Sequence, residues 1–302
     1  MAESTRPLLH GLWGVLATPF TGPAFAVDLQ SLRREVRLFA EVPATGLVAL
    51  GVFGEGASLD SSEQAEVVRT VAGAGVGIPL VVGLSGRSTA VAVEQGRTAV
   101  AHAGPALVGL MVQVNSSDAD VLSRHLTTVH DATGVGVVLQ DYPAASGVHV
   151  SSTTLLTVLR RCPFVVAVKS EAPPTAWAVA ELTAATAVPV FGGLGGIGLL
   201  DELSAGSAGA MTGFSHPEGL RAALDAWAHG GFDAARDAYA PWLPLVNFEA
   251  QPGVGLALRK EVLRRRGVFT EPLVRPPAPS APPQLLGLMD AHLAAIGSRA
   301  RT

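Results

Sequence analysis

The chain contains eight short apolar runs rich in β-branched residues, and segments of helical character separate them. Buried strands of a parallel sheet are typically continuous apolar runs of about four to eight residues, and their alternation with helices indicates βαβ units. Eight such units in 302 residues predict an α/β protein with a (β/α)8 TIM barrel. The runs are Gly14–Phe20, Gly46–Phe53, Pro79–Ser85, Leu107–Gln113, Gly134–Tyr142, Phe164–Lys169, Val188–Gly192 and Gly209–Phe214.

A doubly wound sheet is the competing architecture, because Gly193–Gly198 follows the seventh run with the three-glycine spacing of a dinucleotide-binding turn. The match is weak, since it lies late in the chain in a region already dense in glycine. A glycine-rich turn above a barrel strand is equally suited to presenting N–H groups to a carboxylate or phosphate. We therefore predict no cofactor.

After the eighth run the pattern changes to helices only. We place the barrel at residues 8–222 and a C-terminal helical module at residues 223–302. The helical segments of the module region are Gly219–His229, Phe232–Trp242, Val254–Arg266 and, after a proline-rich segment, Pro283–Ile296.

The bulk composition favours small-molecule chemistry in a reducing compartment. A net charge of −4 and a pI near 6.1 give no electrostatic footprint for nucleic acid or an anionic membrane. The apolar stretches are broken by Gly, Pro or charge before they could span a bilayer. A single cysteine, Cys162, excludes an internal disulfide and a thiolate-rich metal site. We expect a soluble cytoplasmic protein without a metal.

Lys169 is one of only two lysines, against nineteen arginines, and it ends a strand-like apolar run. An ammonium there must be desolvated, paired or chemically employed, and lysine differs from arginine in being able to lose its proton. A neutral amine attacks carbonyl carbon to give a Schiff base, which then serves as an electron sink without a cofactor. The alternative is a lysine that snorkels from the strand end to solvent.

The active site of such a barrel lies at the C-terminal ends of its strands, so polar residues that close each run are the other candidates. Glu171 projects to the same side as Lys169 if the strand continues, as a proton carrier or as an ordinary ion-pair partner. The remaining candidates at strand ends are Thr18, Gln140, Asp141, Tyr142 and His216.

Motifs along nearly the whole chain resemble the dihydrodipicolinate synthase / N-acetylneuraminate lyase family of Schiff-base aldolases. Their order and spacing carry the resemblance together. They are Gly14 with Thr18-Pro19-Phe20, Gly51–Glu55 with Leu59 and Glu63, Gly83 with Ser88-Thr89, Gln140–Pro143 with Gly147, Val168-Lys169, Gly192-Gly193 and Arg275–Pro277.

The resemblance implies that Lys169 forms an imine with pyruvate or another 2-oxo acid, and that Gly192-Gly193 helps to hold the acid's carboxylate. It implies a structural hydrogen-bonding role for Glu55. It also implies a homo-oligomer, a dimer or tetramer, with a 2-oxo acid and an aldehyde-type compound as its small-molecule partners.

Three departures from the family pattern concern the proton relay and the second substrate. Val52 and Phe53 replace a pair of hydroxyl residues, and Gln140 stands where a tyrosine is expected. Ala145 replaces an arginine that binds the carboxylate of the synthases' second substrate, so a true dihydrodipicolinate synthase is not expected. Tyr142 could return a phenol to the site, although two residues displace a group by about 7 Å along a strand, or it could pack over the following proline.

The leading hypothesis is therefore a lyase or aldolase that uses Lys169 on a 2-oxo acid, with Glu171, Tyr142 or Gln140 transferring protons or orienting substrate. Val52, Phe53, Gly192, Gly193, Thr18, Asp141 and His216 are expected to bind substrate. Two alternatives stay open, namely a hydratase-aldolase or dehydratase of a sugar acid or aromatic pyruvate through the same imine, and a non-catalytic barrel that binds a metabolite.

Overall fold

The computed structural model describes residues 6–74 and 76–299, and eight parallel strands in it form one barrel sheet. The sheet order is β10-β1-β4-β5-β6-β7-β8-β9. The barrel closes between β9 and β10, the two ends of this order, where the Met211 N–H donates to the Gly192 carbonyl at 2.9 Å. The strands are β1 (Gly11–Val15), β4 (Gly46–Ala49), β5 (Leu80–Leu84), β6 (Leu107–Gln113), β7 (Val137–Asp141), β8 (Val165–Ser170), β9 (Val190–Phe191) and β10 (Gly209–Thr212).

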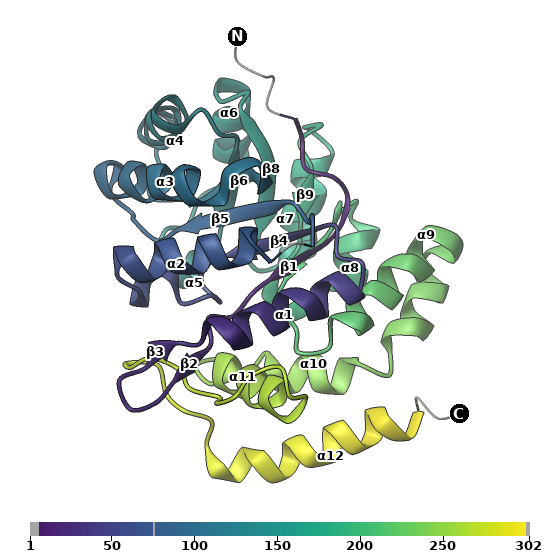
Figure 1. Ribbon diagram of the computed structural model, residues 1–302. Coiled ribbons are helices and arrows are strands. Elements are labelled where there is room, and N and C mark those ends of the chain that lie inside the picture. Colours follow the sequence, from purple (N-terminus) through teal and green to yellow (C-terminus); the bar gives the residue numbers. More distant parts are fainter. Residues whose placement is uncertain (1–5, 75, 300–302) are drawn as a thin grey trace.

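Helices follow the strands and cover the outside of the barrel (Figure 1). The predicted (β/α)8 fold is thus confirmed, and each of the eight apolar runs overlaps one barrel strand. A short hairpin, β2 (Phe20–Thr21) and β3 (Ala26–Val27), follows β1. The helices of this part are α1 (Leu29–Glu41), η1 (Gly56–Ser58), α2 (Ser61–Ala72), α3 (Thr89–Ala103), η2 (Gly104–Ala106), α4 (Ala119–Thr133), α5 (Pro143–Ser146), α6 (Ser152–Arg161), α7 (Thr175–Thr183), η3 (Leu194–Gly196) and α8 (Leu199–Ser204).

Local sequence explains where the helices begin and end. The Asp60 side chain caps α2 by accepting hydrogen bonds from the N–H groups of Ser62 and Glu63. The Glu63 side chain in turn accepts a hydrogen bond from the Asp60 N–H. Asp118 caps α4 in a similar way, and that helix ends at Gly134 with a φ of 71°.

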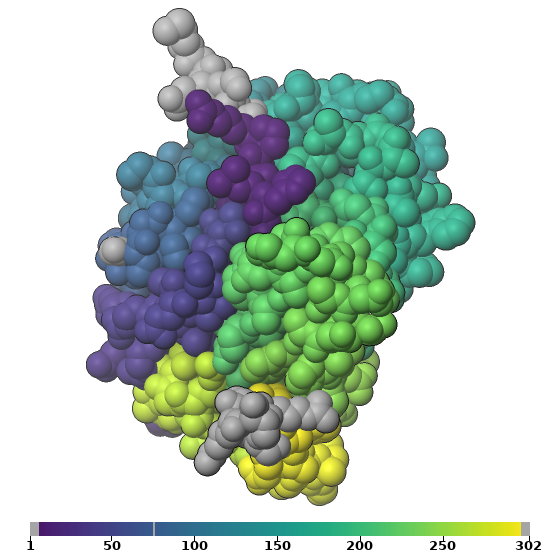
Figure 2. All heavy atoms as spheres, turned by 90° about the vertical axis from the view of Figure 1, so that its right-hand side faces the viewer, coloured from purple at the N-terminus to yellow at the C-terminus, as the bar shows by residue number. Residues whose placement is uncertain are grey.

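Four helices follow β10, namely α9 (Pro217–Tyr239), α10 (Leu243–Glu249), α11 (Gly255–Arg265) and α12 (Pro283–Arg299). Helix α9 lies at the side of the barrel beside α8, whereas α10, α11 and α12 lie below it, at the ends of the strands where the active site of this fold is built (Figure 1). Figure 2 shows the green residues below the teal ones and beside the blue ones, with the yellow residues at the bottom. Within the described ranges, none of these or the other helices combines the length and apolar character needed to span a bilayer.

The element α9 consists of two helical segments, because the backbone at Gly231 is not helical, with a φ of 66° and a ψ of −150°. The two segments agree with the helices predicted over Gly219–His229 and Phe232–Trp242. The expected boundary between residues 222 and 223 falls inside α9, and the division into barrel and module stays a prediction. Residues 300–302 of the module lie outside the described range.

The barrel interior is a layer of large apolar side chains contributed by alternate strand residues. Trp13 and Phe191 meet edge to face with ring centroids 6.5 Å apart, and Gly46 leaves the space that the Trp13 ring fills. Val138 and Ala167 continue this layer from β7 and β8. The next inward positions on those strands therefore open toward the C-terminal end of the barrel.

Candidate functional site

Lys169 and Gln140 are the inward residues that follow this apolar layer on β8 and β7. The two residues are direct partners in the parallel register, and each comes two positions after an interior residue. Both side chains are buried, with Lys169 only 6% exposed. The burial excludes a lysine that snorkels freely to solvent.

The Glu171 carboxylate fixes this end of the site. Its Oε2 lies 3.2 Å from the Lys169 Nζ and accepts a hydrogen bond of 2.8 Å from the Gln140 Nε2. Its Oε1 accepts from the Leu194 N–H at 3.1 Å, and the Glu171 N–H donates to the Asp141 carbonyl at 2.8 Å. The strand alternation that predicts Lys169 and Glu171 on one side holds in the structure.

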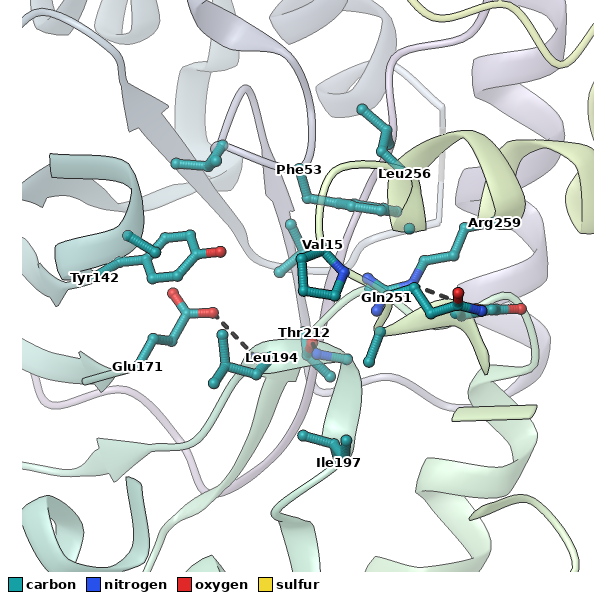
Figure 3. A pocket seen from close by; sticks show the side chains of 18 of the residues that line it. Val15, Phe53, Tyr142, Glu171, Leu194, Ile197, Thr212, Gln251, Leu256 and Arg259 are labelled. Carbon is teal, nitrogen blue, oxygen red and sulfur yellow. Dashed lines mark hydrogen bonds and ion pairs between the residues drawn. The ribbon is translucent and has the colours of Figure 1, made fainter. Parts of the chain in front are cut away.

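Lys169 and Glu171 line a cavity of about 500 Å³ at the C-terminal end of the barrel. Figure 3 shows Tyr142 and Glu171 on one side of the cavity, Arg259 and Gln251 on the other, and Val15 and Thr212 between them. The lining residues are Val15, Val52, Phe53, Gln140, Tyr142, Ala144, Lys169, Glu171, Pro173, Leu194, Gly195, Ile197, Thr212, Gly213, Glu249, Ala250, Gln251, Pro252, Gly253, Gly255, Leu256 and Arg259.

The cavity brings together six of the eleven residues predicted for the site. These are Lys169, Glu171, Tyr142, Gln140, Val52 and Phe53. Burial raises the pKa of the Tyr142 phenol, with a smaller effect of the same sign from the Glu171 charge. Tyr142 lines the cavity two residues beyond Gln140, and a phenol that keeps its proton can donate to a developing oxyanion, so its part in a proton relay stays a prediction.

The other five predicted residues do not line this cavity. Thr18 is buried and donates to the Gly54 carbonyl at 2.6 Å, behind the site. Asp141 points out of the barrel, and burial raises its pKa to about 6. His216 lies against Trp242, with ring centroids 5.6 Å apart, and burial lowers its pKa to about 3.

Gly192 and Gly193 are also outside the lining, and two carboxyl groups occupy the space that their side chains would need. A Cβ on Gly192 would meet the Glu202 carboxyl, and one on Gly193 would meet the Glu171 carboxyl. The next N–H groups of this turn have acceptors, since Leu194 donates to Glu171 and Gly195 to the Thr212 Oγ1. Burial raises the pKa of Glu202 to about 7.

Arg259 of α11 is the principal lining residue that sequence reasoning missed. Its Nε lies 3.3 Å from the Glu249 Oε2, and its guanidinium lies 5.0 Å from the centre of the Phe53 ring. Glu249 is fully buried and accepts from the Ser215 N–H and hydroxyl. Burial lowers the pKa of Arg259, and the Glu249 charge opposes that effect.

The second lysine of the chain, Lys260, has a structural environment. Its side chain is fully buried, and its Nζ donates to the Thr18 carbonyl at 2.7 Å, the Leu273 carbonyl at 2.8 Å and the Glu55 carboxylate. Glu55 also accepts from the Arg275 N–H at 2.9 Å. These contacts are those of a structural hydrogen-bonding glutamate.

A second cavity of about 520 Å³ lies beside the first at the ends of β4 to β7. The two share Val52, Gln140 and Leu256 in their walls. Ala145 lines this second cavity, together with the exposed Arg87. Within residues 6–74 and 76–299, the acidic, histidine and cysteine side chains form no group of three suited to a metal ion.

Comparison with known proteins decides the family. The model of the dihydrodipicolinate synthetase family matches residues 8–287. The chain belongs to this family. Its resemblance at the level of motifs is thereby confirmed, and the protein is a lyase of the aldolase type.

Two curated relatives match almost the full length of the chain. The L-2-keto-3-deoxyarabonate dehydratase of Azospirillum brasilense is 31% identical, over 94% of this chain and 93% of its own. The 4-hydroxy-tetrahydrodipicolinate synthase of Kineococcus radiotolerans is 30% identical, over 98% and 96%. The nearly equal identity to a dehydratase and a synthase gives the family and leaves the substrate to be argued from the site.

Solved structures agree with the barrel. A dihydrodipicolinate synthase from Rhodopseudomonas palustris superposes with a TM-score of 0.88 at 26% identity, covering 96% of this chain and 98% of that one. A prophage protein of the dihydrodipicolinic acid synthase family from E. coli K12, in complex with pyruvate, has a TM-score of 0.85 at 19% identity, covering 96% and 99%.

Proposed function

We propose that this lyase binds a 2-oxo acid as an imine on Lys169. The observation that carries the proposal is a buried amine at the end of β8, facing a cavity of about 500 Å³, with the Glu171 carboxylate 3.2 Å away. A carboxylate beside the amine can accept its proton and release the neutral nucleophile. The E. coli relative in complex with pyruvate supports a 2-oxo acid as the ligand.

The covalent step needs only groups that line the cavity. The neutral Lys169 Nζ attacks C2 of the acid, and the carbonyl oxygen takes up a proton to give a carbinolamine. Loss of water then gives the iminium ion, which withdraws electrons from the bonds around C3. Glu171 and Tyr142 are the proton carriers in this proposal, and Gln140 orients the Glu171 carboxylate through its 2.8 Å hydrogen bond.

The turn after β4 is proposed to hold the acid's C1 carboxylate. Within the described chain, the N–H groups of Val52 and Phe53 donate to no other residue. Both residues line the cavity that contains Lys169. Successive free N–H groups in a turn form a site that suits an anion, so the loss of hydroxyl side chains at these positions leaves a backbone donor pair in place.

A dehydratase reaction on a hydroxylated 2-oxo acid is the second candidate. The Azospirillum relative acts, by its name, as a dehydratase of a keto-deoxy sugar acid. The elimination would use the same iminium ion, with a proton lost from C3 and a hydroxyl leaving from C4 after protonation by Glu171. Analysis of the products separates the two reactions, because a retro-aldol cleavage releases two carbonyl compounds and a dehydration releases water and one longer acid.

Reductive trapping tests the imine directly. The protein is incubated with pyruvate or a longer 2-oxo acid and then with borohydride, and the adduct is located by peptide mass spectrometry. With only two lysines in the chain, Lys260 serves as the internal control. We expect the adduct on Lys169 alone, and the proposal fails if no small 2-oxo acid modifies Lys169.

We also propose that the protein acts in the cytoplasm as a homo-oligomer, a dimer or tetramer, as its family resemblance implies. Light scattering coupled to size-exclusion chromatography measures the mass in solution, and a monomer at micromolar concentration would contradict the oligomer.

A further inference from the structure

The cavity has one cation that the imine chemistry leaves unused. Lys169 and Arg259 are the basic residues among those that line it, and Glu171 and Glu249 are the acidic ones. Lys169 is paired with Glu171. An acid that forms an imine on Lys169 therefore meets a second, separate charged pair inside the same cavity.

The Arg259 guanidinium lies in the wall of the cavity with its donors unused. Within the described residues its N–H groups make no hydrogen bond, and its Nε, although 3.3 Å from Glu249, is buried without one. A guanidinium carries five donors, and a buried donor left without an acceptor is unfavourable. The Arg259 side chain is only 10% exposed, and its N–H groups can still donate hydrogen bonds to a ligand in the cavity.

Three neighbours hold this guanidinium in place. Glu249 lines the cavity as the partner of Arg259, and its carboxyl group is itself held by hydrogen bonds from Ser215. The Phe53 ring lies 5.0 Å beneath the guanidinium carbon. Gly195 leaves room for the Nη2, because a Cβ there would stand 2.1 Å from that atom.

Arg259 lies across the cavity from the carboxylate that serves the amine. Figure 3 places Glu171 and Tyr142 at one side and Arg259 at the other, with Thr212 between. An acid of three carbons held at Lys169 fills only part of a cavity of about 500 Å³. The rest of the cavity, whose wall includes Arg259, has room for a longer chain.

We propose that Arg259 is a specificity-determining residue that donates hydrogen bonds to an oxygen at the far end of the 2-oxo acid's chain. This inference rests on the proposed function of Lys169, since it names the substrate class of that same site. The oxygen belongs either to a terminal carboxylate or to a hydroxyl group, and both accept from a guanidinium. The preferred substrates are accordingly longer 2-oxo acids with a polar end.

The test compares acids of equal length that differ only at that end. The probes are 2-oxopentanoate, 2-oxoglutarate and 5-hydroxy-2-oxopentanoate, with pyruvate as the short reference. Borohydride trapping gives the half-saturating concentration of each probe. We expect the wild-type protein to bind at least one polar-ended acid about 10- to 100-fold more tightly than 2-oxopentanoate. The carboxylate and hydroxyl arms then identify which oxygen Arg259 recognises.

Substitution assigns the preference to this residue. Arg259→Met should weaken trapping of the preferred polar-ended acid about 10- to 100-fold more than it weakens trapping of pyruvate, because methionine is of similar length but donates no hydrogen bond. Arg87→Met, in the second cavity, is the matched control and should keep the preference. Since Arg259→Met leaves a buried carboxylate without its cation, the double variant with Glu249→Gln is measured alongside and should show the same loss.

Two results overturn the inference. One is a wild-type protein with no preference for either polar-ended acid, and the other is a variant that loses pyruvate as strongly as the longer acids. Calorimetric titration of Lys169→Ala with the same probes measures the preference without an imine. Absence of any Lys169 adduct in the wild type therefore defeats the proposed function, whereas adducts or binding without end selectivity defeat only the role of Arg259.

Discussion

Replacement of Lys260 by methionine should destabilise the fold more than any change at Lys169. The Lys260 Nζ is fully buried and joins α11 to the barrel through the Thr18 carbonyl and the Glu55 carboxylate. Its third acceptor is the Leu273 carbonyl, in the segment that leads to α12. Methionine fills similar volume but leaves Glu55, which is 7% exposed, without its cation.

The magnitude follows from the cost of an uncompensated buried charge. Breaking a buried ion pair by removal of one partner costs about 3–5 kcal/mol. The unfolding entropy of about 2.1 cal/mol/K per residue gives about 0.6 kcal/mol/K for the 302 residues. The midpoint of thermal unfolding should therefore fall by about 5–8 °C.

Differential scanning calorimetry of three variants checks this reasoning. Lys260→Met should show the full decrease, and Lys260→Met combined with Glu55→Gln should recover part of it, because the amide carries no charge to leave unpaired. Lys169→Met is the control, since the Glu171 that it leaves behind faces the open cavity and keeps bonds from Gln140 and the backbone. A Lys260→Met protein that melts within about 2 °C of the wild type would refute the argument.

Two further substitutions test the carboxyl groups around the site. Glu171→Gln should lower turnover by about 100- to 10,000-fold while borohydride trapping on Lys169 stays measurable. A variant that turns over as fast as the wild type would show that Glu171 does not transfer protons. Burial raises the pKa of the Glu202 carboxyl from 4.5, its value in the unfolded chain, to about 7. The free energy of unfolding of the wild type should therefore fall by about 3 kcal/mol as the pH rises from 4.5 to 7. Glu202→Gln has no proton to lose there, so its free energy of unfolding should rise by that amount relative to the wild type over the same interval. Denaturant titrations at several pH values measure it, and parallel curves for the two proteins would contradict the burial effect.

Much of the fold follows from the sequence because strand periodicity is local. The predicted strand Phe164–Lys169 differs from β8, Val165–Ser170, by one residue at each end. The alternation of side chains along a strand was enough to place Glu171 on the same side as Lys169. The short helix α10 and the β2–β3 hairpin have no comparably strong pattern and were not predicted. They form because tertiary contacts bury them, which no single stretch of sequence displays.

Arg259 could not be assigned to the site from its own segment. It stands beside Lys260 and Glu261 in α11, and a run of charged residues in a helix normally indicates a solvated face. All three are buried in the structure, because α11 packs against α10 and the C-terminal end of the barrel. The usable signal was the rarity of lysine, which applied to Lys260 as much as to Lys169.

The two lysines separate two reasons for choosing an amine over a guanidinium. At Lys169 the amine faces a cavity and a carboxylate, where the ability to lose a proton has chemical use. At Lys260 three acceptors converge on one nitrogen, and a compact ammonium with three donors satisfies them where a planar fork would not fit. Rarity of lysine thus identifies a position where arginine is unsuitable, and only the surroundings of the nitrogen distinguish chemistry from packing.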